Sequence, residues 1–347
     1  MSRYPEADLG RVRTTAIGRR KSLVVDASLY RPPTRLGSFE AFWQSMPQSL
    51  GAADLRAVVG AVLASRGRGR PVIALCGAHV LKTGMGPGLI ALVDKGLLTG
   101  LGFNGAGTVH DVELALWGRT SEDVTAELQT GRFGMARETA KFLNAAAREA
   151  ARAGEGLGEA LGRLLIAERR DAVRRSVLAA AYRRGVPVTV HVAIGTDIHH
   201  QHPDFDGAAT GESSARDFRI LAASLLEIRG GTVLVFGSAV ILPEVFLKAY
   251  SVACNLGAKR DGMVTAVFDF IRHYRPMENV VRRPTQGTGK GYYLVGQHEI
   301  LLPIFFHACL LGWKEGRRTR ADVGRHKVLK GPRVASDKSR GADRRSR

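Results

Sequence analysis

Cysteines and long apolar runs are scarce in this sequence, and their scarcity excludes several classes of protein. The 347 residues include three cysteines, which are widely spaced. An odd number without disulfide or metal-ligand spacing predicts buried thiols in a reducing, cytoplasmic compartment. No stretch approaches the roughly 18–20 consecutive apolar residues of a membrane span. The first nine residues are polar, so we expect neither secretion nor a membrane partner.

A complete phosphate loop is also missing. The run Gly287-Thr288-Gly289-Lys290-Gly291 has part of its pattern, but no glycine stands five residues before Gly289. Gly291 occupies the position of the serine or threonine that holds magnesium. The sequence therefore does not predict an ATPase. Lys290 could instead be a cation in a site, an imine-forming amine or a solvated loop lysine.

The sequence lacks an aromatic–basic stacking motif, although its net charge is +19. Residues 314–347 hold 13 basic and 4 acidic residues, so this tail contributes +9. Because the tail has no apolar periodicity, we predict that it is disordered and could bind RNA or other polyanions non-specifically.

Apolar, strand-like runs are abundant, and five of them stop in clusters of glycine and polar residues. The five runs are residues 72–77, 98–103, 188–194, 232–236 and 292–295, and a further strand is expected at 264–268. The first four are each followed by a helix-like stretch, which predicts a doubly wound, mostly parallel sheet with right-handed crossovers. The carboxyl ends of parallel strands form a ligand crevice, so the five polar endings predict one nucleotide-type cofactor site.

Helical periodicity fills the intervening segments. We expect helices at residues 39–65 (one or two), 88–95, 111–117, 138–153, 157–182, 213–227, 244–256 and 300–311, and a further helix that starts at residues 120–123.

The turn after the second run is suited to backbone approach by a cofactor. Asn104, Gly105, Ala106 and Gly107 stand between a strand and a helix, where glycine admits unusual dihedral angles and free N–H groups attract an anion. Residues 84–88 are similar and predict either a phosphate-binding loop or a tight turn.

The loop at residues 196–206 is rich in ionisable side chains, with three His and three Asp. These side chains could hold a divalent metal, as in a metal-dependent hydrolase, or they could form a polar active-site loop. Asp197 stands at the strand end, where a carboxylate suits a ribose hydroxyl. His199 and His202 are acid/base candidates, as is His298 after the last strand.

The order of these elements resembles that of the deoxyhypusine synthase family from about Pro71 to Trp313. Four motifs carry the resemblance: residues 106–111 are similar to the family's Ala-Gly-Gly and acidic segment, 194–197 to its Thr-Asp strand end, 237–239 to its Gly-Gly-Gly turn, and 296–299 to its Ala-Asp-Ala-Ser segment. The resemblance implies a Rossmann-like fold, NAD as cofactor and a homo-oligomer, a homotetramer in the family. It divides the chain into an irregular and helical segment at 1–70, a cofactor-binding catalytic domain at 71–313 and the basic tail at 314–347.

The chain departs from the family at its substrate site. The family's Trp-Gly-Lys, whose lysine forms the imine, is absent, and so is its Ser-Asp-Ser-Gly-Ala segment. Residues 274–291 are basic instead, and Glu244 stands near the position of a family histidine. A polycation such as spermidine needs carboxylates, so a basic segment favours an anionic or amino-acid-like substrate.

These observations lead to one main hypothesis and one alternative. The main hypothesis is a cytoplasmic NAD-dependent transferase or oxidoreductase that moves hydride from an amine-bearing carbon with imine chemistry, on an amine or amino-acid-like substrate other than spermidine. The alternative is an inert family member that acts as an RNA or protein adaptor through its tail. In the main hypothesis, NAD is held by Asn104, Gly105, Ala106, Gly107, Asp197, Gly237, Ser238 and Gln297. The catalytic candidates are Lys290, His298, His199 and His202. The substrate is bound by Arg282, Arg283 and Glu244, and no metal ligand is assigned.

Overall fold

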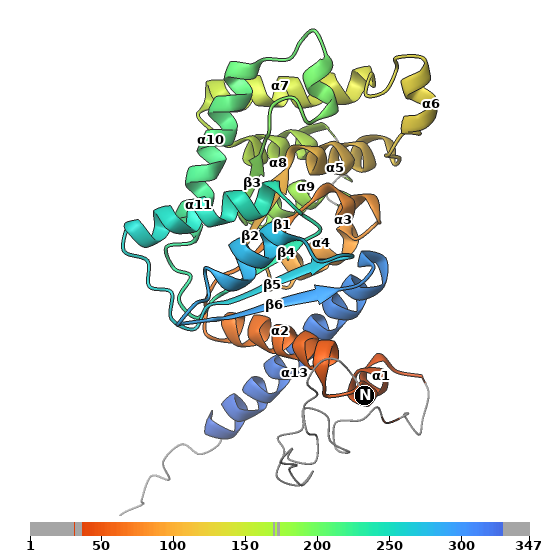
Figure 1. The fold of residues 1–347 in the computed structure, drawn as a ribbon. Helices are drawn as coiled ribbons and strands as arrows, with labels where there is room; N and C mark the ends of the chain where they lie inside the picture. The colour runs from red at the N-terminus through yellow and green to blue at the C-terminus, as the bar shows by residue number, and fades with distance from the viewer. Residues whose placement is uncertain (1–30, 32–36, 169–170, 172–173, 329–347) are drawn as a thin grey trace, which may run out of the picture.

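A parallel sheet forms the centre of the computed structural model, which describes residues 31, 37–168, 171 and 174–328, the last fourteen of them as backbone alone (Figure 1). The described strands are β1 (Val72–Cys76), β2 (Gly100–Asn104), β3 (Val188–His191), β4 (Thr232–Phe236), β5 (Val264–Asp269) and β6 (Lys290–Val295). Their order is β3-β2-β1-β4-β5-β6, and all neighbours pair in parallel. The predicted α/β fold, doubly wound around a parallel sheet, is confirmed.

Helices cover both faces of the sheet, which explains why its central strands are continuous apolar runs. Every residue of β1 and β4 is buried. Successive side chains of a strand point to opposite faces. Accordingly Val72, Ala74 and Cys76 belong to the larger core, whereas Ile73 and Leu75 belong to the smaller one.

The larger core is formed against helices from most of the chain. They are α2 (Leu50–Gly67), α3 (Ala78–Lys82), α4 (Gly86–Asp94), α5 (Gly105–Trp117), α7 (Arg137–Ala153), α8 (Leu157–Glu168), α9 (Val177–Arg183) and α13 (His298–Val328). The smaller core lies under α10 (Gly207–Ser224), α11 (Ile241–Asn255) and the π-helical turn η6 (Met277–Arg282). The remaining elements are α1 (Phe39–Ser45), α6 (Val124–Gln129), η5 (Ile198–Gln201) and α12 (Tyr274–Pro276).

One predicted helix, residues 157–182, is wrong in the structure, because it is divided into α8 and α9. The hydroxyl of Ser176 caps α9 by accepting from the N–H of Ala179 and donates to Asp111 at 2.5 Å. Asp111 also accepts from the N–H of Val177 at 2.8 Å. This buried carboxylate stabilises a helix start in the middle of an alanine- and arginine-rich pattern, and burial raises its pKa to about 6.

The ends of the chain differ in part from the prediction. Helix α13 continues to Val328, so a stretch expected to be disordered from residue 314 begins as a helix. Residues 329–347, the rest of the predicted basic tail, lie outside the described residues, as do 1–30 and 32–36. Within the described part of the chain, no helix combines the length and apolar character needed to cross a membrane.

Candidate functional site

The candidate site lies at the carboxyl edge of the sheet, where the strand order reverses between β1 and β4. These neighbours pair from Val72 with Thr232 to Cys76 with Phe236. The chain leaves β1 into α3 on one face and leaves β4 into α11 on the other (Figure 1). Such a switch point is where open α/β sheets bind ligands.

Two glycines bring the backbones of these turns close together. A Cβ atom on Gly77 would lie 1.9 Å from the carbonyl oxygen of Gly237. Gly237 has φ +58°, and a Cβ there would lie 2.6 Å from Cε1 of His298. Both positions therefore require glycine, and the second fixes the place of the His298 ring.

A pair of histidines links the ends of β1, β5 and β6 at this point. Nδ1 of His79, which follows β1, lies 2.9 Å from Nδ1 of His298. Nε2 of the buried His298 lies 3.2 Å from the carbonyl oxygen of Phe268. A carbonyl accepts, so Nε2 of His298 carries the proton and its Nδ1 accepts from His79. His79 then keeps an unprotonated Nε2. Burial is the main cause that lowers the pKa of His79, and the charge that His298 carries when it is protonated lowers it further.

We predict that Gly237→Ala lowers the free energy of unfolding and disrupts the histidine pair. The positive φ alone costs roughly 1–2 kcal/mol for a residue with a Cβ, and the clash with His298 adds to it. Gly195→Ala is the matched control, because Gly195 has φ +93° but nothing within 4 Å of its Cβ. Urea denaturation should show the larger loss for Gly237→Ala; equal losses would contradict the packing role.

The start of α5 is closed by the protein's own side chains. The amide oxygen of Asn104 accepts from the N–H of Gly107 at 3.1 Å, and Asp197 accepts from the N–H of Ala106. A Cβ on Gly105 would lie 1.9 Å from Oδ2 of Asp197, so the carboxylate rests on the helix start. Burial raises the pKa of Asp197 to about 6. The structure brings together these five predicted residues, here as a helix cap.

Sequence reasoning also overlooked a glycine pattern at this turn. Residues 100–105 read Gly-Leu-Gly-Phe-Asn-Gly, which has the spacing of the dinucleotide fingerprint. Its first two glycines lie inside β2, where a Cβ on Gly102 would meet the side chain of Leu75 at 2.6 Å. Only Gly105 stands at the turn. The first two glycines instead allow β2 to pack closely against the side chains of β1.

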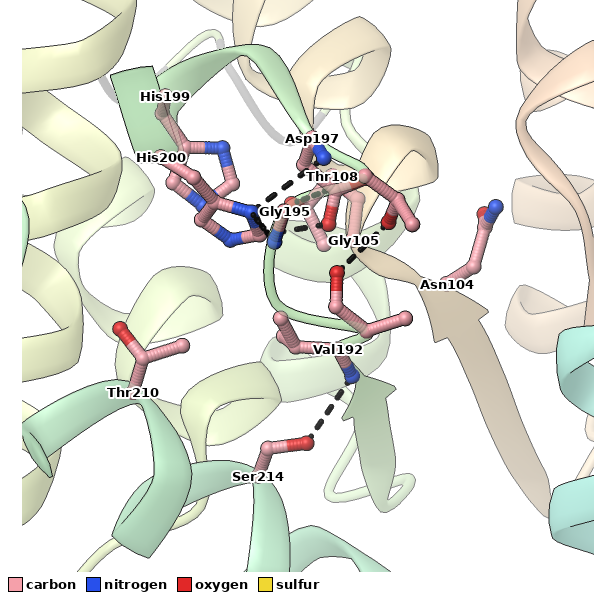
Figure 2. A network of polar contacts seen from close by, with 12 residues as sticks. Asn104, Gly105, Thr108, Val192, Gly195, Asp197, His199, His200, Thr210 and Ser214 are labelled. Carbon is pink, nitrogen blue, oxygen red and sulfur yellow. Dashed lines mark hydrogen bonds and ion pairs between the residues drawn. The ribbon is translucent and has the colours of Figure 1, made fainter. Parts of the chain in front are cut away.

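The histidine-rich loop is held by its own hydrogen bonds (Figure 2). Nδ1 of His200 accepts from the N–H groups of Gly195 and Asp197 at 3.1 and 3.3 Å. His202 donates to the carbonyl of Gly134 at 2.9 Å, and burial lowers the pKa of His199 to about 3. Among the residues described, no group of three or more His, Cys, Asp or Glu side chains could hold a metal ion. The loop supports the start of α5 through Asp197.

Three predicted residues lie away from this edge. Lys290 opens β6 and pairs with Val264, which opens β5, so it stands at the amino edge of the sheet. Arg282 donates to Glu278, and Arg283 donates to Asn279 just before β6. The structure does not bring Lys290, Arg282 or Arg283 together with the carboxyl-edge residues, and we leave them out of the proposed site.

Ser238 and Gln297 follow the ends of β4 and β6, and Glu244 lies in the first turn of α11. Ser238 accepts from the N–H of Leu242 at 3.2 Å, and the exposed Gln297 precedes His298. Glu244 forms ion pairs with Lys248 and Arg275, and it accepts from Asn279. The hydrogen bond from Lys248 is the main cause of its lowered pKa. These partners already neutralise the Glu244 carboxylate, so it is poorly suited to bind a cationic substrate.

No protein-family model and no curated protein matches the sequence. Among solved structures, a ternary complex of AgrE with ornithine and NAD+ is similar with TM-score 0.47 and 16% identity, over 75% of this chain and 33% of that one. A conserved protein from Methanococcus maripaludis S2, provisionally described as LOR/SDH, has TM-score 0.45 and 16% identity, over 75% and 69%. A candidate deoxyhypusine synthase from Entamoeba histolytica has TM-score 0.46 and 10% identity, over 78% and 92%. The chain spans about a third of the length of AgrE and ArgZ.

Proposed function

We propose that this chain is a deoxyhypusine synthase-like, NAD-dependent enzyme that removes hydride from an amine-bearing carbon, with attack on the resulting imine. The observation that carries the proposal is the strand order β3-β2-β1-β4-β5-β6, with glycine-bearing turns on both sides of the switch point. Dinucleotide-binding sheets have this order and bind their ligand across that crevice.

The residues at the edge fit a dinucleotide in part. Gly77 and Gly237 let the turns after β1 and β4 pack against each other at the crevice, so the place of a side chain at either position is filled by the protein itself. Asp197 fills the start of α5, so a phosphate is not expected there. A cavity of about 280 Å³ at the end of β3, lined by His191, Val192 and Ser214 among others, would take one end of the cofactor. Bound NAD supplies the hydride acceptor.

His79 and His298 supply the proton transfer. A substrate ammonium must lose a proton before its carbon can release hydride, and the unprotonated Nε2 of His79 is suited to accept it. The N–H bond of the ammonium breaks and a new N–H bond forms on His79. His298 and the carbonyl of Phe268 stabilise the resulting imidazolium through the chain of hydrogen bonds.

We predict that the purified protein binds NAD+ with a dissociation constant between about 1 µM and 1 mM, the usual range for enzyme ligands. Isothermal titration calorimetry measures it. Gly77→Ala should weaken binding, because its Cβ would displace Gly237, whereas Gly60→Ala on α2 has open space and should not. Absence of NAD+ binding by the folded wild type would overturn the proposal.

Cytoplasmic location and a homo-oligomer remain part of the proposal, by resemblance to the deoxyhypusine synthase family. Light scattering of the purified chain tests the oligomer.

A further inference from the structure

A second cavity lies beside the start of α5, on the carboxyl edge of the sheet. Its volume is about 320 Å³, at the lower end of the roughly 300–1,000 Å³ typical of ligand pockets. Its lining includes Ala106 at the start of α5, Asp197 after β3, Ser121 between α5 and α6, and Ala136 just before α7. A neighbouring hollow shares four lining residues with it: Glu113, Ser121, Glu122 and Ala136.

A relay of three side chains fixes the protonation of His110 in this cavity. The hydroxyl of Thr120 donates to Glu113 at 2.6 Å and lies 2.7 Å from Nδ1 of His110. Thr139 donates to the other oxygen of Glu113 at 2.9 Å. Since the one proton of Thr120 goes to Glu113, His110 donates from Nδ1 and keeps an unprotonated Nε2. Burial lowers the pKa of His110 and favours this neutral form.

The charges that line the cavity are unequal. Lys82 is positive, whereas Glu113, Glu122 and Asp197 are carboxylates. Burial is the main cause that lowers the pKa of His110; the charge of Glu113 opposes this shift and the charge of Lys82 adds to it. Lys82 and His79 both lie on α3, so one short helix borders both the cavity and the switch point.

Apolar side chains complete the lining. Val109, Val124, Phe133 and Ile198 lie along the cavity with the charged groups. A ligand with an aliphatic chain between charged ends matches this arrangement, since the chain removes apolar surface from water while its ends pair with charges.

We propose that this cavity binds a dibasic amino acid, with its carboxylate on Lys82, its side-chain ammonium toward the carboxylates and Nε2 of His110, and its α-ammonium toward His79, which precedes Lys82 by one turn of α3. One carboxylate and two amines match a lining of one cation and three carboxylates. The proposal rests on the proposed function, because it names the substrate class of that enzyme. Binding at this cavity is nevertheless measurable without NAD.

Calorimetry with three probes tests the charge pattern. L-lysine has both features, cadaverine lacks the carboxylate, and L-norleucine lacks the side-chain amine. We expect L-lysine to bind at least about tenfold more tightly than either, which corresponds to one strong charge interaction. Lys82→Met should abolish the preference for L-lysine over cadaverine, and cadaverine, a dication, should bind at least as tightly as it does to the wild type. Equal affinity for all three probes, or equal losses for L-lysine and cadaverine in Lys82→Met, would overturn the proposal.

A second pair of variants tests the relay, in which Thr120 is a positioning residue. Thr120→Val removes the hydroxyl between Glu113 and His110, and we expect L-lysine to bind about tenfold more weakly. Thr120→Ser keeps the hydroxyl and should restore the affinity; failure of this rescue in a folded variant counts against the relay.

Titration of the same proteins with NAD+ separates the two proposals. Binding of NAD+ without discrimination among the three probes overturns the cavity proposal alone. If the protein binds L-lysine but fails to bind NAD+, the cofactor proposal is overturned, and the cavity then stands as a binding site without its role as a substrate site.

Discussion

Replacement of His79 by glutamine lowers turnover about 10²–10⁴-fold, the usual loss when a general base is removed, and leaves the affinity for NAD+ nearly unchanged. Glutamine keeps the polarity of the imidazole and cannot accept the substrate proton. The chain from His79 through His298 to the carbonyl of Phe268 leaves Nε2 of His79 as the basic atom. Charge that develops on His79 spreads into this chain.

The measurement is the rate of NADH formation with a panel of primary amines and dibasic amino acids. His307→Gln is the control, because His307, on α13, packs against Phe39 of α1 with ring centroids 4.2 Å apart and is not part of the chain of hydrogen bonds. Wild-type turnover by His79→Gln would remove His79 from the reaction. A parallel loss of NAD+ affinity would instead assign it to cofactor binding.

The central strands could be predicted because burial on both faces demands an unbroken apolar run. β1, β4 and β5 match residues 72–77, 232–236 and 264–268 closely. β6 begins at the exposed Lys290, two residues before the predicted run, because its amino end is not buried and the sequence there is not apolar. The start of α9 was missed because it depends on Asp111, a carboxylate from a helix far away in the sequence.

The edge of the sheet that carries the candidate site could be predicted from the sequence, but the side chains that meet there could not. His79 lies two residues after the first apolar run, which ends at Gly77. Nothing in the sequence near His79 indicates that α13 places His298 against it. The register of β6 places Lys290 at the edge opposite the crevice, which the sequence did not show because the predicted run begins two residues later. The cap formed by Asp197 depends on the loop beyond β3, whose path no periodicity predicts.

Asp217 is the buried group with the largest expected effect on stability. It lies on α10 with no exposed surface, and Oδ2 accepts from the N–H groups of Gly158 and Val190 at 3.0 and 2.8 Å. Oδ1 is buried without a hydrogen-bond partner. Burial is the main cause that raises the pKa of Asp217 to about 7. The carboxyl therefore joins α8 to β3, and its ionisation lowers the stability of the folded protein because the charge is buried.

The sign of the pH effect follows from this raised pKa. Unfolded, Asp217 titrates near its ordinary value of about 3.9, so between that value and about 7 the folded protein binds more protons. Its contribution to stability is full below about pH 3.9 and is lost as the pH rises through 7.

Asp217→Asn removes this dependence, so the free energy of unfolding of the wild type, relative to the variant, should fall by about 2–3 kcal/mol between about pH 5 and pH 8. Urea denaturation of both proteins at the two pH values measures the difference. The other shifted groups, among them Asp111, Asp197, His191 and His199, are present in both proteins and cancel. A difference that stays constant with pH would mean that Asp217 is ionised in the folded protein throughout, and that the N–H groups of Gly158 and Val190 offset its burial.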